Sequence, residues 1–137
     1  MRDNVFIDTN VLVYAYFNTD SFKHEKSVSF LENYHYDYII SVQVLSEFCN
    51  VGIKKMKSSV LKIQNNIEAI LADCDLAIIS EKTIYKALSI QEKHKFSYYD
   101  SLIISSALEN GCKYLLSEDL TNKQEIEGLV IRNIFIA

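Results

Sequence analysis

The 137-residue chain alternates short apolar runs with longer segments of helical period, and this alternation limits the folds it can adopt. The runs expected to form strands are residues 4–7, 38–40, 76–79, 114–116 and 129–132. Such alternation is typical of a mostly parallel sheet with helices on both faces. We therefore expect an α/β chain, a three-layer α/β/α sandwich, formed as a single domain over residues 1–137.

Two segments carry the clearest helical patterns. Residues 58–73 repeat apolar side chains at three- and four-residue steps, and Ser58 or Ser59 is suited to cap the start. Residues 102–108 form a broader apolar surface that ends at Asn110-Gly111, a glycine signal for a helix C-terminus. The first helix should leave a polar face in water, and the second should be largely buried.

The bulk properties exclude several classes of protein. A net charge of −4 is unfavourable for gripping nucleic acid through a basic face alone, so a nucleic-acid role must use bound cations. Three cysteines stand singly, with no C-x-x-C pair, which argues against a disulfide framework and a zinc site. No apolar stretch approaches the roughly 20 residues needed to span a bilayer, and no signal peptide is evident, so we expect a cytoplasmic protein.

Four acidic residues stand where an α/β fold places ligand sites. Asp8 and Asp119 follow expected strands, Asp100 opens a helix, and Glu47 lies about two turns into a helix beginning near Ser41. Taken singly, each has an ordinary structural role as a helix cap, a turn residue or a solvated side chain. Glu47 and Asp100, however, have apolar neighbours, and a buried charge without a partner is costly.

Clustered carboxylates repel one another, and no Arg or Lys is adjacent in sequence to any of the four. The simplest compensation is a hard divalent cation with oxygen ligands, Mg²⁺ or Mn²⁺. Such ions activate water and neutralise charge on a departing oxygen. The expected chemistry is hydrolysis of a phosphodiester.

At this point the sequence resembles the PIN-domain nucleases, and within them the VapC-type toxins of toxin–antitoxin pairs. The resemblance rests on Asp8-Thr9-Asn10, Ser46-Glu47-Phe48, Tyr99-Asp100 and the segment 116–120, which follow one another in the family's order. It implies that Asp8, Glu47, Asp100 and Asp119 are catalytic metal ligands, supported by Asn10 and Ser117. It also implies an endoribonuclease acting on RNA, a homodimer and a separate antitoxin. The chain departs from the family at Asn133, where relatives often place a proline next.

Several assignments remain open on the sequence alone. Glu118 stands beside Asp119, and either side chain can face the site, although we expect Asp119 to do so. Lys54 and Lys55 belong to a basic patch that is either a substrate-binding rim or a solvated helix end. Tyr99, beside Asp100, is expected to face the substrate, as aromatic side chains do in many RNA-binding proteins.

Other functions have weaker support. A catalytically inactive PIN-like module that binds RNA or protein is the main alternative, because a fold does not fix a function. A receiver-type signalling domain is more remote, since Asp8 has no adjacent acid and no aspartate ends the third expected strand. The three histidines are dispersed and show no spacing typical of a metal site or a catalytic triad.

Overall fold

Six strands form one sheet in the structure, a computed structural model that describes residues 2–136; Met1 and Ala137 lie outside the described residues. The strands are β1 (Asp3–Ile7), β2 (Tyr36–Ser41), β3 (Cys74–Ala77), β4 (Tyr114–Leu116), β5 (Glu125–Ile126) and β6 (Leu129–Arg132). Their spatial order is β3-β2-β1-β4-β6-β5, and only the β5–β6 pair is antiparallel. The expected three-layer α/β/α sandwich with a mostly parallel sheet is confirmed.

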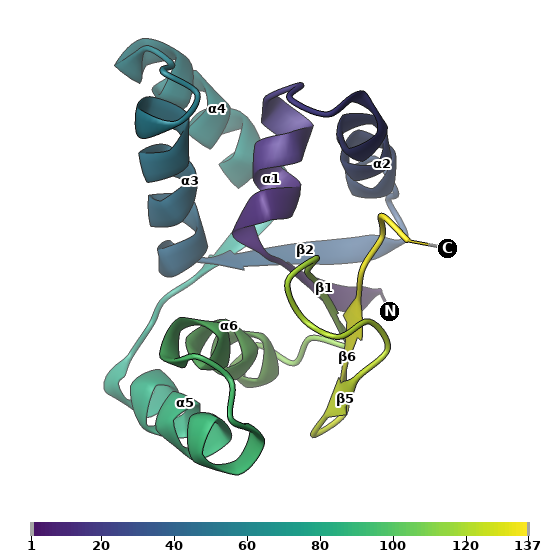
Figure 1. The fold of residues 1–137 in the computed structure, drawn as a ribbon, viewed down its shortest axis with the longest axis vertical. Helices are drawn as coiled ribbons and strands as arrows, with labels where there is room; N and C mark the ends of the chain where they lie inside the picture. The colour runs from purple at the N-terminus through teal and green to yellow at the C-terminus, as the bar shows by residue number, and fades with distance from the viewer. Residues whose placement is uncertain (1, 137) are drawn as a thin grey trace.

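Helices cover both faces of this sheet (Figure 1). One layer holds α1 (Thr9–Tyr16), α2 (Ser21–Leu31), α3 (Val42–Lys54) and α4 (Val60–Asp73). The other holds α5 (Glu81–His94) and α6 (Tyr98–Glu109), which pack against each other. None of the helices in the described part of the chain is long and apolar enough to cross a membrane.

The core lies between these layers and the central strands. Val5, Phe6 and Ile7 of β1 are fully buried, as expected for a parallel strand covered on both faces. The helix expected to be largely buried is α6, in which every residue from Ser101 to Ala107 is buried. On the other face of the sheet, α4 is capped by Ser59, one of the two serines that the sequence offered for this role. Much of the surface of α4 is exposed, as expected.

The expected strands at 4–7 and 38–40 are longer in the structure, Asp3–Ile7 and Tyr36–Ser41, and the larger differences lie in the edge strands β3 and β5. The third strand is Cys74–Ala77, and the prediction of 76–79 was wrong because Ala77 is the last residue with a partner on β2, Ser41. Beyond it Ile78 is 69% exposed. The two-residue strand β5 was not predicted, since it is too short for a periodic signal and turns into β6 through Glu127 and Gly128, both with positive φ.

Candidate active site

The strand order reverses between β1 and β4, the position at which open α/β sheets bind ligands. These neighbouring parallel strands are in register through Ile7 and Leu116. The Asp8 amide N–H donates to the Leu116 carbonyl at 3.0 Å, which continues the pairing by one residue. Asp8 and Ser117 therefore leave the carboxyl ends of adjacent strands side by side.

Asp8 is held rigidly at the start of α1. Its carboxylate accepts from the Thr9 amide at 2.7 Å and from the Ser117 hydroxyl at 3.0 Å. The residue is only 9% exposed. Burial raises the pKa of Asp8 from 3.8 to about 6, although these two hydrogen bonds lower it, and the charges of Asp119 and Glu47 raise it further.

Glu47 reaches the same region from the second turn of α3. Ser41, the last residue of β2, caps this helix by accepting from the Val44 amide and so fixes where the helix begins. One Glu47 oxygen accepts from the Thr9 hydroxyl at 2.9 Å, and the other accepts from the Gln43 amide at 2.7 Å. The carboxylate is thus oriented by two donors from different elements.

Asp119 and Asp100 complete the acidic set. The Asn10 side-chain amide donates to Asp119 at 3.1 Å, and Asp100 lies in the first turn of α6. The pKa of Asp119 is raised, first by burial and then by the charges of Glu118 and Asp100. The charges of Glu47 and Asp119 thus act on Asp8, and that of Asp100 acts on Asp119.

Glu118 is occupied elsewhere. Its two oxygens accept from Lys23 at 2.7 Å and from the Tyr14 hydroxyl at 2.8 Å. It is absent from the described residues that line the acidic pocket, whereas Asp119 is among them. This geometry favours Asp119 over Glu118 as the member of the site.

The four acids line a single pocket of about 100 Å³. The described residues around it are Asp8, Thr9, Asn10, Gln43, Glu47, Tyr99, Asp100, Ile103 and Asp119, and none of them is basic. Nowhere in residues 2–136 do three or more Asp, Glu, His or Cys side chains stand at a spacing that already fits a metal ion. The pocket thus gathers four carboxylates, and those of Asp8, Glu47 and Asp119 accept hydrogen bonds from neighbouring donors.

Of the residues expected to bind substrate, only Tyr99 lines the acidic pocket. Tyr99 lines the acidic pocket and is 65% exposed, as a substrate-facing side chain requires. Lys54 and Lys55 are exposed at the end of α3 and do not line it. Lys55 instead lines a neighbouring pocket of about 390 Å³ that shares Asn10 with the acidic one.

Thr9 and Gln43 were not singled out from the sequence, although both bind Glu47. Gln43 stands four residues before Glu47, the spacing at which two side chains meet on one face of a helix, and this signal was available. Thr9 lies inside a recognised motif, but its contact spans 38 positions. Its role depends on a packing of α1 against α3 that the sequence does not reveal.

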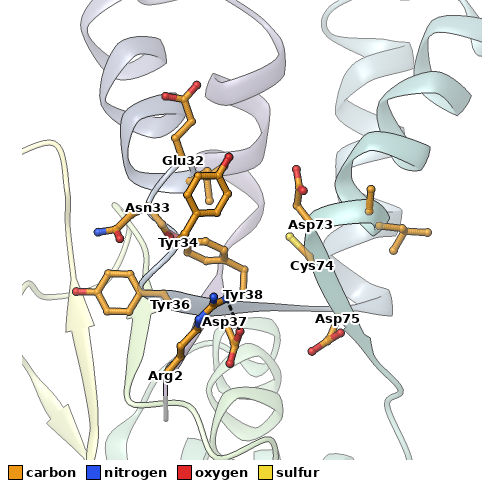
Figure 2. Close-up of a pocket in the computed structure, with 13 residues that line it drawn as sticks. Arg2, Glu32, Asn33, Tyr34, Tyr36, Asp37, Tyr38, Asp73, Cys74 and Asp75 are labelled. Atoms are coloured by element: carbon orange, nitrogen blue, oxygen red, sulfur yellow. Dashed lines mark hydrogen bonds and ion pairs between the residues drawn. The ribbon is translucent and has the colours of Figure 1, made fainter.

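Acidic side chains also line a second pocket of about 270 Å³ at the amino ends of β1, β2 and β3 (Figure 2). Tyr34, Tyr36 and Tyr38 stand around it, and Arg2 pairs with Asp37 at 3.6 Å. This edge is opposite to the carboxyl ends of the parallel strands, where ligand sites of open sheets occur. The smaller pocket at the strand switch is therefore the candidate active site.

The raised pKa of Asp8 predicts a pH effect on the metal-free protein. Because the folded carboxyl holds its proton up to about pH 6, the folded state binds more protons than the unfolded state above pH 3.8. The free energy of unfolding should therefore fall as the pH rises from about 4 to about 6, by up to about 3 kcal/mol from this group. Urea unfolding in chelator checks this, and the difference between wild type and Asp8→Asn should show the slope; an equal pH profile for both would contradict it.

The chain is similar to known proteins in both sequence and structure. The family model described as PIN domain matches residues 5–123. The chain is similar in structure to VapC20 of Mycobacterium tuberculosis, a sarcin-ricin loop cleaving toxin, with a TM-score of 0.70 and 13% identity over 84% of this chain and 91% of that one. No curated protein matches the sequence significantly.

Two further similar structures are complexes. One is a toxin–antitoxin complex from Klebsiella pneumoniae, with a TM-score of 0.71 and 21% identity over 92% of this chain and 95% of that one. The other is VapBC2 from Rickettsia felis bound to a DNA fragment from its promoter, with a TM-score of 0.68 and 20% identity over 95% of this chain and 98% of that one. With the family model covering most of its length, the chain belongs to the PIN domain family.

Proposed function

We propose that this chain is a divalent-metal-dependent endoribonuclease and the toxin of a toxin–antitoxin pair. The observation that carries the proposal is the convergence of Asp8, Glu47, Asp100 and Asp119 on one pocket that no basic residue lines among those described. Carboxylates placed together without a positive partner are typical of sites that hold cations. Family membership supports the same reaction class.

The chemistry of the donor set fits a divalent cation. All the polar groups around the pocket offer oxygen, or an amide that holds an oxygen ligand in place, and hard cations such as Mg²⁺ and Mn²⁺ prefer oxygen. The Gln43 amide oxygen, Oε1, is buried without a hydrogen-bond partner among the described residues, so this residue of the pocket adds a neutral oxygen donor that no other described group uses. The residues that would hold the ion are the four acids, and a bound ion would supply water activation and charge neutralisation on the phosphodiester.

The remaining side chains of the site act as positioning groups. Thr9 and Gln43 fix the two oxygens of Glu47, Ser117 fixes Asp8, and Asn10 fixes Asp119. Rigidly held ligands lower the reorganisation needed in the reaction. A pocket of about 100 Å³ suits a phosphodiester group better than a whole base, so the bases of an RNA would lie outside it.

The proposal includes protein partners and a place in the cell. Two of the similar structures are toxin–antitoxin assemblies, which supports a cognate antitoxin for this chain. Large apolar side chains are exposed on several elements, and their burial would favour protein partners, either the antitoxin or a second copy in a homodimer. They include Val60, Leu61, Ile78 and Tyr85, each more than 60% exposed. We propose action in the cytoplasm, where RNA is available.

Cleavage of a total-RNA pool by purified protein tests the function. The reaction should require Mg²⁺ or Mn²⁺ and give discrete products that vanish in chelator and in Asp8→Asn. End mapping of the products would identify the RNA. Intact RNA together with a protein that binds no metal would instead favour the non-catalytic binding module.

Tyr99 offers a test of substrate contact. Its ring is exposed at the pocket and lies 5.3 Å from that of Tyr98 between centroids, so it can stack on a base beside the scissile phosphate. Tyr99→Ala should raise KM about tenfold, from the loss of about 1–3 kcal/mol of stacking, with little change in kcat. Steady-state kinetics measure both values, with exposed Tyr34→Ala as the control. Equal KM values for the two variants would exclude this role.

A further inference from the structure

Gln43 carries an unexplained buried acceptor at the acidic pocket. It is the second residue of α3 and lines the pocket together with the four acids. Its amide oxygen is buried and has no hydrogen-bond partner within residues 2–136. Leaving such an acceptor unsatisfied costs on the order of 1–3 kcal/mol, so the fold carries a group that a ligand should complete.

The orientation of this amide is fixed by Glu47. The Gln43 nitrogen donates to Glu47 Oε1 at 2.7 Å, and an ionised carboxylate accepts hydrogen bonds only. Turning the amide over would bring two oxygens into contact, which is unfavourable. Thr9 holds the other Glu47 oxygen at 2.9 Å, so the carboxylate does not rotate to offer an alternative. The amide oxygen is therefore the free end of the side chain.

We propose that Gln43 is a further residue of the cation site, in which the amide nitrogen positions Glu47 and the amide oxygen serves the divalent cation as a neutral donor. Amide oxygens are ordinary ligands of hard cations. A neutral donor also adds to the ligand set without adding repulsion to four carboxylates that already oppose one another. This inference rests on the proposed metal-dependent function and names an additional residue for it.

Gln43→Met removes both roles with little change in side-chain size. We expect its Mn²⁺ affinity, measured by calorimetry, to fall about tenfold or more, as for other residues that support metal ligands. The melting temperature in chelator should not fall, because the variant no longer buries an unsatisfied oxygen. The matched control is Gln64→Met, the same substitution at an exposed position on α4, and it should leave both values unchanged.

Gln43→Glu separates the two roles. It keeps an oxygen toward the cation but cannot donate to Glu47 when ionised. Mn²⁺ affinity should stay at or above that of the wild type, whereas kcat for RNA cleavage should fall about tenfold because Glu47 loses its positioning. A purely structural role for Gln43 would lower the metal-free melting temperature of Gln43→Met, where no charge is added, and would not produce this split.

The outcomes separate this inference from the function on which it rests. Two results together support it. Gln43→Met binds Mn²⁺ more weakly than the wild type, and Gln43→Glu keeps its Mn²⁺ affinity but has a lower kcat. Wild-type Mn²⁺ affinity in a folded Gln43→Met protein overturns it and leaves the proposed nuclease intact. A wild-type protein that binds no Mn²⁺ and leaves RNA intact overturns both.

Discussion

Asp8→Asn should reduce RNA cleavage by at least about 10³-fold while making the metal-free protein more stable. The first effect follows because the variant removes a negative charge from the centre of the acidic pocket, where Asp8 faces Glu47 and Asp119. The second follows because the same charge is buried and its burial raises the pKa of Asp8 to about 6. Replacing it with a neutral amide relieves both desolvation and repulsion.

These two effects should be measured on the same samples. Cleavage is followed on the mapped RNA substrate, and stability is followed by thermal unfolding in chelator and again with Mn²⁺. The wild type should gain stability with Mn²⁺, and Asp8→Asn should gain little, because ligand that binds only the folded state stabilises it. In Asp8→Asn, cleavage should therefore fall while metal-free stability rises. A variant that is inactive because it has unfolded would lose both.

Asp3→Asn is the matched control. Asp3 begins the same strand, is exposed, and among residues 2–136 forms an ion pair only with Lys113, at 3.4 Å; its loss should therefore change stability by less than about 1 kcal/mol and leave cleavage intact. Full activity in Asp8→Asn would remove Asp8 from the site. Reduced stability in chelator would show that its hydrogen bonds to Thr9 and Ser117 outweigh the cost of its burial.

Much of this fold was predictable because its signals are local. The strand β1 is an uninterrupted apolar run, and the helix α4 has a clear apolar period with a serine at its start. The errors arose where pairing decides the structure. Ile78 and Ile79 have apolar, β-branched side chains typical of a strand. However, β2 ends at Ser41, which caps α3, so no strand in the described part of the chain pairs with them.

Only the four acids, and the residues that the family resemblance implied, could be predicted for the site. Each acid is an ordinary helix or turn residue when taken alone, and only the strand order brings Asp8 and Asp119 to the same switch point. The groups that hold the acids were harder to find. Thr9 meets Glu47 because α1 packs on α3, and Glu118 is turned away because Lys23 and Tyr14 bind it, contacts that depend on tertiary structure.

Phe48→Ala should lower the free energy of unfolding by about 3–5 kcal/mol, a large part of the stability of a domain this size. Phe48 follows Glu47 on α3, is fully buried, and lies 5.8 Å from the ring of Tyr16 and 5.9 Å from that of Phe17 between centroids. Truncation leaves a cavity between α1 and α3 that the surrounding core fills only in part. Urea unfolding measures the loss.

The same cavity should also slow RNA cleavage, because Phe48 packs at the contact between the helices that carry Thr9 and Glu47. We expect the folded fraction of Phe48→Ala to lose more in cleavage rate, measured at saturating Mn²⁺, than in Mn²⁺ affinity. A metal ligand displaced by about 1 Å still binds the ion but no longer aligns the reacting groups. Phe22→Ala, at a ring 53% exposed on α2, should change neither stability nor cleavage beyond about 0.5 kcal/mol. Equal stability losses in the two variants would mean that the α1–α3 contact does not depend on Phe48, and the link between core packing and Glu47 would have to be abandoned.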